Sequence, residues 1–172
     1  MSIKYYLAKI RYKLHGNNYE IMNDYYRKCG AKIGHGVLIC TNIAGNEACL
    51  IEIGNNTTIS TDVAFVTHDF SVKNLGRGMN NIFGKVVVGN NCFIGCRAVL
   101  MYGVTLGDNI IVAAGSVVTH SFKEENVIIG GNPARVIGTW DSFYDKVKDK
   151  SLSYKNLAEI VREHPEKLVS RD

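Results

Sequence analysis

Residues 88–119 read VGNNCFIGCRAVLMYGVTLGDNIIVAAGSVVT, and this stretch decides the fold. An aliphatic residue stands at every sixth position of it without a break. These positions are Val88, Ile94, Leu100, Leu106, Val112 and Val118. Segments eighteen residues apart also match in kind, since Val88-Gly89-Asn90-Asn91 is followed by Leu106-Gly107-Asp108-Asn109. Such a repeat predicts a coil with three sides, each of them one six-residue unit.

In such a coil, one aliphatic side chain on each side points into a prism-shaped interior. Glycine, asparagine and aspartate at the corners accept the positive φ that a sharp turn requires. Small residues four positions after an aliphatic one, such as Ala98 and Ser116, fit inside the turn. The hairpins of an ordinary β-sandwich alternate with period two instead. Six consecutive matched units therefore favour a parallel β-helix.

The same spacing occurs upstream, with two interruptions. The earlier aliphatic and aromatic positions are Ile33, Ile39, Ile53, Ile59 and Phe65. From Ile39 to Ile53 the spacing is fourteen residues rather than twelve, which predicts a bulge of about two residues. Between Phe65 and Val88 the period is lost, so we expect an excursion loop at about residues 69–85.

Helical segments are expected at both ends of the coil. Residues 1–32 predict an N-terminal helical segment that is broken near His15-Gly16-Asn17-Asn18. The coil then covers residues 33–138, and residues 139–172 predict a C-terminal helical segment ended by Pro165. The predicted fold class is thus an all-β core, a parallel β-helix of hexapeptide repeats, with helices at both ends.

The first helical segment carries apolar residues at helical spacing. Ile3, Tyr6, Leu7 and Ile10 recur at intervals of three and four, a face that we expect to pack against the neighbouring structure. Four basic residues accompany this face: Lys4, Lys9, Arg11 and Lys13. Contact of the N-terminal helix with an anionic membrane surface is therefore the alternative interpretation.

Composition restricts the classes of protein that remain. The 172 residues are 46% hydrophobic and 21% charged, which is typical of one globular domain. The net charge of +4 comes from scattered basic residues, which argues against nucleic-acid binding and suits small anionic ligands. Five cysteines without a CxxC pair or zinc-finger spacing, in a chain without a signal peptide, indicate reduced thiols and a cytoplasmic location.

Three features together resemble one known family. They are the hexapeptide pattern, Thr67-His68-Asp69 before the loop, and the closing Gly130-Gly131-Asn132-Pro133-Ala134-Arg135-Val136-Ile137. The chain resembles the hexapeptide-repeat acyltransferases over about Ile33 to Gly138. Within them it is most similar to the sugar O-acetyltransferase branch, which includes galactoside, maltose and many capsule or lipopolysaccharide acetyltransferases. The resemblance implies a left-handed β-helix and a homotrimer with active sites between subunits. It also implies acetyl-CoA as acyl donor, without a required metal.

His68 is the expected catalytic residue. An imidazole titrates near neutral pH and can take a proton from a hydroxyl as the oxygen attacks a thioester. A lone histidine is more often a hydrogen-bonded surface or core residue. Here the resemblance implies a general base at this position, where the chain leaves the repeat for a long loop. Asn42 and Asp69 are expected to bind the acceptor.

The resemblance also implies that acetyl-CoA lies along a groove between two prisms, held largely by backbone groups. The matching positions are Cys96, Ala114 and Thr119, of which Cys96 and Ala114 stand eighteen residues apart. That spacing stacks the two on adjacent coils. A catalytic Cys96 in a ping-pong mechanism is the rival interpretation, but no histidine or acid stands at a repeat position beside it.

Three further residues are candidates for the nucleotide end of the cofactor. Arg135 is expected to contact a phosphate, a task suited to its fixed fork of donors, and Lys123 to assist. His120 stands where relatives often carry a lysine near the cofactor phosphates. Gly138 occupies the place of a second arginine that some relatives have.

The predicted function is direct acetyl transfer from acetyl-CoA to a hydroxyl of a sugar or surface-polysaccharide precursor. The same fold also supports N-acetylation of an amino sugar and acetylation of serine or an antibiotic. A gamma-type carbonic anhydrase would require paired histidines on adjacent repeats, which are missing. A non-catalytic β-helix is disfavoured by the presence of His68 and Arg135.

Overall fold

Three β-sheets form the centre of the computed structural model, which describes residues 3–43, 45–153, 155 and 157–170. The first sheet contains β1 (Lys32–Ile33), β3 (Ile51–Ile53), β8 (Val86–Val88) and β11 (Thr105–Leu106). The second contains β2 (Leu38–Ile39), β4 (Thr58–Ile59), β9 (Phe93–Ile94), β12 (Ile111–Val112), β14 (Val127–Gly131) and β15 (Ala134–Thr139). The third contains β5 (Ala64–Phe65), β10 (Val99–Leu100) and β13 (Val117–Val118).

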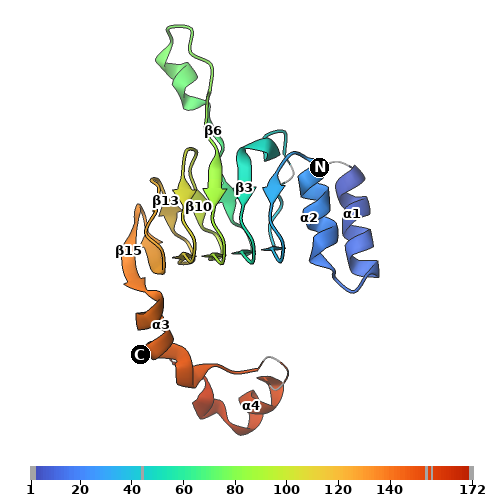
Figure 1. The fold of residues 1–172 in the computed structure, drawn as a ribbon, viewed down its shortest axis with the longest axis vertical. Helices are drawn as coiled ribbons and strands as arrows, with labels where there is room; N and C mark the ends of the chain where they lie inside the picture. Colours follow the sequence, from blue (N-terminus) through green and yellow to red (C-terminus); the bar gives the residue numbers. More distant parts are fainter. Residues whose placement is uncertain (1–2, 44, 154, 156, 171–172) are drawn as a thin grey trace. The chain divides into compact units, whose positions relative to one another are not determined.

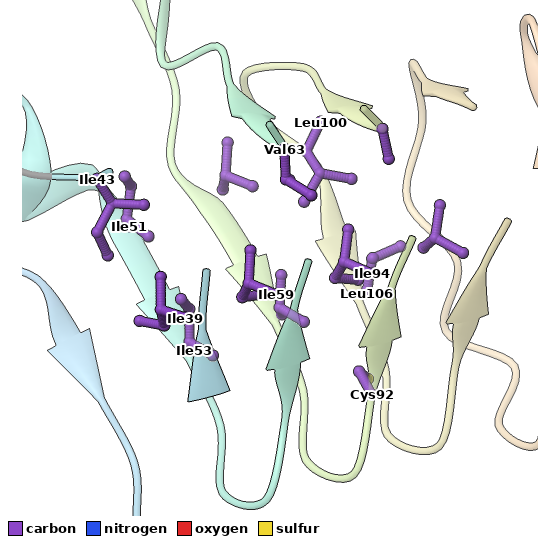
Figure 2. Packing of buried hydrophobic residues seen from close by; sticks show 14 of the residues in the cluster. Ile39, Ile43, Ile51, Ile53, Ile59, Val63, Cys92, Ile94, Leu100 and Leu106 are labelled. Atoms are coloured by element: carbon purple, nitrogen blue, oxygen red, sulfur yellow. The ribbon is translucent and has the colours of Figure 1, made fainter. Parts of the chain in front are cut away.

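Successive strands of the chain belong in turn to the first, second and third sheets, so the chain winds as a three-sided coil (Figure 1). The parallel pairs join residues eighteen apart, with Val88 opposite Leu106 in the first sheet and Leu100 opposite Val118 in the third. All six aliphatic residues of the repeat are at most 1% exposed. Figure 2 shows Ile94, Leu100 and Leu106 packed in the interior between the sheets. The six-residue period is therefore confirmed as the side of a coil.

The corners are made as the sequence pattern predicts. Asn56, Asn91 and Asn109 all adopt positive φ, between 53° and 56°, a conformation that asparagine tolerates well. Neighbouring corners are also joined through side chains, since the Asn90 backbone N–H donates to Asp108 Oδ1 at 2.7 Å. Corner residues thus both turn the chain and hold successive coils together.

Replacing Leu100 by alanine should lower the free energy of unfolding by about 2–5 kcal/mol, because it leaves a cavity in a rigid, closely packed interior. Leu100 is fully buried in the structure. Leu75 is 68% exposed, so Leu75→Ala is a matched control that should change stability by less than about 0.5 kcal/mol. Urea unfolding of both variants measures the difference.

The first coil differs from those that follow it, because none of its described residues forms a strand of the third sheet. Residues 45–50 instead form a turn and a short 3-10 helix, η1 (Ala48–Leu50). As a result β5 is the edge strand of its sheet. An edge strand leaves peptide groups without strand partners on its outer side.

A second departure from the coil begins directly after β5. Strands β6 (His68–Asp69) and β7 (Ile82–Phe83) pair antiparallel, and η2 (Ser71–Leu75) lies between them. We call residues 70–81 the arm. Figure 1 shows it projecting away from the sheets, beyond β6. The antiparallel pair is not signalled by the periodicity, because two-residue strands carry too little pattern to be read.

Two helices cover the start of the coil. α1 (Ile3–Leu14) is followed by α2 (Tyr19–Lys28), which begins at Asn18, whose side chain accepts from the Glu20 backbone N–H at 3.0 Å. α2 buries Met22 and Tyr26, and Asn23 Nδ2 donates to the Val37 carbonyl at 2.9 Å. α1 in turn lies against α2.

The face of α1 that packs is not the expected one. Ile3, Tyr6, Leu7 and Ile10 are exposed, whereas Tyr5 and Ala8 are buried and Tyr12 is half-buried. The expectation was wrong because α1 carries apolar residues at helical spacing on both faces. Ala8 is small and lets the two helices approach, and the ring of Tyr5 lies 5.9 Å from that of Tyr25.

Contacts divide the chain into two compact units, the first ending at Ile137 and the second beginning at Gly138. The second unit contains α3 (Trp140–Val147), η3 (Lys148–Lys150), α4 (Leu157–Glu163) and η5 (Pro165–Lys167). α3 begins with reciprocal hydrogen bonds between Thr139 and Ser142. Within the described residues, every helix is too short or too polar to cross a bilayer.

Candidate active site

A hollow of about 640 Å³ lies beside the edge strand β5. It is lined by Asn42, Ile43, Gly45, Asn46, Glu47, Ala48, Ile51, Val63, Ala64, Phe65, Val66, Thr67 and His68. Of its lining residues, Ile43, Ile51 and Val63 belong to the buried apolar core (Figure 2), while the side chains of Glu47 and His68 are partly exposed.

Thr67 and His68 meet Glu47 at one end of this hollow. Glu47 Oε2 lies 2.8 Å from His68 Nδ1, and the Thr67 hydroxyl donates to the same oxygen. The hydrogen bonds from Thr67 and then His68 hold the pKa of Glu47 below its usual value. Glu47 is therefore a carboxylate at neutral pH and can only accept. In the neutral form of the imidazole, Nδ1 of His68 must therefore be the nitrogen that carries the proton, and Nε2 the one with the free lone pair.

The backbone around His68 is held from two sides. Thr67 is buried, and its carbonyl accepts from the Gly84 N–H at 2.9 Å. His68 pairs with Phe83 across the two short strands, and their rings lie 6.0 Å apart. The His68 side chain is still 43% exposed. The imidazole is thus oriented by fixed neighbours while one nitrogen remains accessible, as general base chemistry requires.

Asn42 and Asp69, both expected to bind the acceptor, occupy different places. Asn42 lines the hollow, and the preceding Thr41 is held by its hydroxyl, which donates to the Val63 carbonyl at 3.2 Å. Asp69 is not part of the lining described above. Its Oδ1 accepts from the Ser71 N–H at 2.8 Å and its Oδ2 from the Tyr102 hydroxyl at 3.2 Å. The hydrogen bonds from Ser71 are the main cause of its lowered pKa.

Asp69 therefore ties the base of the arm to the following coil through Tyr102. Its role toward an acceptor stays a prediction.

Cys96 and Ala114 are exposed at one corner of the coil, on adjacent turns. Their strands align Ile94 with Val112, and the Gly115 N–H donates to the Cys96 carbonyl at 2.9 Å. A Cβ atom on Gly95 would come within 2.5 Å of the Ala114 backbone nitrogen, so glycine permits this close approach. Cys96 is a free thiol, and among the described residues its sulfur has no hydrogen bond to a histidine or carboxylate. The geometry gives no support to a nucleophilic Cys96.

Thr119 and His120 lie along a different edge. Thr119 and His120 come directly after β13, and Val66 and Thr67 come directly after β5 in the same way. β10 lies between these two strands in the third sheet. With strands about 4.8 Å apart, this places them about 10 Å from the level of Thr67 along the coil. Thr119 Oγ1 and His120 Nδ1 are 3.4 Å apart, and the His120 ring lies 4.5 Å from that of Phe122.

Lys123 and Arg135 are both exposed. Arg135 lies on β15, where its guanidinium donates to the Ala134 carbonyl at 2.8 Å. This hydrogen bond uses one N–H group of the exposed guanidinium, and the other N–H groups remain for a ligand. The structure therefore does not gather the expected cofactor residues into one pocket of a single chain. It distributes them over the edges of the prism.

Glu47 is the residue that the sequence analysis missed. The fourteen-residue spacing between Ile39 and Ile53 signals that extra residues stand there, but not which of them turns toward His68. Within the parts of the chain that the structure describes, no three histidine, cysteine, aspartate or glutamate side chains gather in a way that could hold a metal ion.

Comparison with known proteins places these features in context. A family model described as the hexapeptide repeat of succinyl-transferase matches residues 85–120. Protein CapG of Staphylococcus aureus is 36% identical over 156 residues, which cover 88% of this chain and 89% of CapG. The galactoside O-acetyltransferase of Escherichia coli K12 is 30% identical over 134 residues, or 76% of this chain and 66% of that protein.

A solved structure shares the fold. The hexapeptide-repeat acetyltransferase VCA0836 of Vibrio cholerae, in complex with acetyl-CoA, superimposes with a TM-score of 0.52 at 23% identity. The match covers 73% of this chain and 77% of the other. At this identity the likeness concerns the architecture, and it agrees with the three-sided coil described above.

Proposed function

Because the chain belongs to the hexapeptide-repeat acetyltransferase family, we propose that it transfers an acetyl group from acetyl-CoA to a hydroxyl of a sugar or surface-polysaccharide precursor. The observation that carries this proposal is the His68 and Glu47 pair at the end of an open hollow. The galactoside O-acetyltransferase among the relatives supports a sugar hydroxyl as acceptor.

The proposed reaction is one direct transfer. Nε2 of His68 takes the proton of the acceptor hydroxyl as its oxygen attacks the carbonyl carbon of the thioester. Glu47 stabilises the imidazolium that forms. When the tetrahedral intermediate collapses, the carbon–sulfur bond breaks, and the imidazolium returns its proton to the CoA thiolate. The products are the O-acetyl ester and CoA, with His68 neutral again.

The positions of the candidate cofactor residues favour a site shared between subunits. His68, Thr119 and His120 follow strands of the third sheet, while Cys96 and Ala114 lie at a corner after the second. Because these two groups of residues lie on different sides of one prism, a single subunit cannot bring both of them to the same ligand. We infer a homotrimer of left-handed β-helices, in which the edge of one copy faces the corner of the next. Acetyl-CoA lies in the groove between them.

The hollow beside β5 is the proposed acceptor site. Its volume of about 640 Å³ is within the range of small-molecule pockets. Asn42 and the open edge of β5 offer hydrogen-bonding groups suited to sugar hydroxyls. The arm adds Lys73 and Arg77, which could face the acidic or nucleotide-linked part of an acceptor. The five cysteines are free thiols, which supports a cytoplasmic enzyme.

An acceptor screen tests this proposal. Acetyl-CoA is incubated with the enzyme and free sugars, nucleotide sugars, serine or chloramphenicol, and the CoA thiol released is measured. We expect release with a sugar acceptor, together with one acetyl ester found on a product hydroxyl by mass spectrometry and base lability. Transfer only to amino groups, or no transfer to any acceptor, would contradict O-acetylation of a sugar.

Replacing Arg135 by alanine should raise the KM for acetyl-CoA about tenfold while kcat changes little. The loss of one charge-assisted hydrogen bond to a phosphate removes binding that the ground state and the transition state share. Steady-state kinetics with the donor varied measures the effect. Arg162→Ala is the matched control, because Arg162 is an exposed arginine of α4 that pairs with the neighbouring Glu163. An unchanged KM in Arg135→Ala would remove this residue from the donor site.

A further inference from the structure

We propose that α1 attaches the protein to an anionic membrane surface, lying in the interface without crossing the bilayer. The first observation is an apolar stripe that faces away from the protein. Ile3 and Leu14 are 76% exposed, and Leu7 and Ile10 are exposed by 55% and 54%. Spaced four, three and four residues apart, these side chains form one continuous stripe along the helix.

The stripe is held outward by the packing of the opposite face. Tyr5 and Ala8 are buried against α2, and α2 is itself anchored to the first coil through Met22 and Tyr26. Figure 1 shows α1 as the outermost element at this end of the coil, with α2 between it and the sheets. Rotation of α1 to hide the stripe would expose Tyr5. The apolar stripe is therefore a fixed outer surface of the folded unit.

Basic residues border the stripe on both sides. The helical spacing places Lys4 and Arg11 along one border and Lys13 along the other, while the Lys9 ammonium lies 5.2 Å from the centre of the Tyr5 ring on the packed side. α1 contains no aspartate or glutamate. An apolar stripe between rows of basic residues is the pattern of helices that lie in the headgroup region of anionic bilayers. In this position, the aliphatic parts of the lysine and arginine side chains contact the apolar region, and their charged groups bind the lipid phosphates.

A shallow hollow between α1 and α2 adds a place for a headgroup. It measures about 300 Å³, and Lys4, Arg11 and Lys28 line it together with the exposed Leu7. Asp24 also lines it, but its carboxylate already pairs with Arg27 at 2.7 Å. Three cations beside an apolar side chain suit a phosphate whose acyl chains lie next to it.

Charge argues against a second copy of this chain as the occupant. Two copies joined through the same face would bring both sets of basic residues together, with no acidic residue of α1 to pair with them. A membrane surface of high negative charge density is complementary to the whole border. An anionic bilayer is therefore the proposed partner of α1, and the test below distinguishes it from self-association.

Cosedimentation with lipid vesicles tests the proposal, using the full chain without acetyl-CoA so that the result does not depend on catalysis. We expect binding to phosphatidylcholine vesicles that contain about one third phosphatidylglycerol, and weak binding to phosphatidylcholine alone. The double variant Leu7→Ser with Ile10→Ser should lower the partition coefficient at least about tenfold. Lys4→Ser with Arg11→Ser should lower it about fivefold per charge and reduce its dependence on salt.

Val161→Ser is the matched control, because Val161 is 52% exposed on α4, a helix that also carries acidic residues. It should bind vesicles as the wild type does. All altered residues of α1 are exposed, so thermal unfolding midpoints should stay unchanged and exclude misfolding as the cause. Failure of the wild type to bind anionic vesicles would overturn the proposal. So would unchanged binding by the stripe variant, or an effect of that variant on self-association alone, measured by sedimentation velocity.

Discussion

Replacing His68 by alanine should lower kcat by about 10²-fold or more, because the acceptor hydroxyl then loses the group that takes its proton. The KM for acetyl-CoA should change little, since the imidazole acts on the acceptor. The fold should be maintained, as the side chains of His68 and of its partner Glu47 are 43% and 32% exposed. Initial rates of CoA release with a saturating sugar acceptor measure the loss.

Two measurements make the assignment of His68 specific. His35→Ala is the control, because His35 is an exposed histidine at a coil corner outside the hollow, and its rate should equal that of the wild type. Raising the pH should restore part of the activity of His68→Ala, since hydroxide in solution can replace a missing base. Full activity in His68→Ala at neutral pH would remove this residue from the mechanism.

Replacing Glu47 by glutamine should lower kcat by about tenfold to 10²-fold, again with little change in the KM for acetyl-CoA. The amide keeps the size of the side chain but loses the charge that stabilises the imidazolium, and it can present its NH₂ group to His68 Nδ1. Glu47 is a positioning residue, because it reaches the acceptor only through His68. Thr67→Val, which removes the other hydrogen bond to Glu47, should have a smaller effect.

The pH dependence of stability distinguishes this role from simple packing. Hydrogen bonds from Thr67 and His68 hold the folded-state pKa of Glu47 below its usual value. Their stabilising contribution is therefore complete above the ordinary glutamate pKa and is lost as the pH falls through the lowered one. The thermal midpoint of the wild type should exceed that of Glu47→Gln at neutral pH, and the gap should shrink in acid. A gap that is constant with pH would contradict the ionised Glu47.

The parts of the fold that the sequence predicts are those where one environment recurs. Leu100 and Leu106 meet the same prism interior, so the same residue type returns every six positions. Glu47 could not be predicted in this way, because it lies between Ile39 and Ile53, where the spacing is not a multiple of six. α1 shows a different limit: Tyr5 and Ala8 recur at helical spacing just as Leu7 and Ile10 do, and periodicity cannot choose between two apolar faces.

His68 could be located because a break in a regular pattern marks the residues around it. Its partner and its tautomer depend on a contact between residues twenty-one positions apart, which only the folded chain brings together. Asn42, which lines the hollow, also lies in the irregular segment between Ile39 and Ile53. Sequence periodicity therefore predicts the edge at which the candidate site lies. The side chains that meet at this edge come from irregular segments, which periodicity cannot predict.

The irregular spacing between Ile39 and Ile53 also bears on how the proposed acceptor site can diversify. Elsewhere in the prism, an inserted residue would shift a side chain out of the stacked interior and weaken every turn above it. The segment between Ile39 and Ile53 already departs from the repeat, and it lies beside the edge strand β5. This segment can vary in length and composition while the coils behind it stay unchanged. If the hollow binds the acceptor as we propose, acceptor preference can evolve, or be engineered, in this segment without change to the rest of the coil.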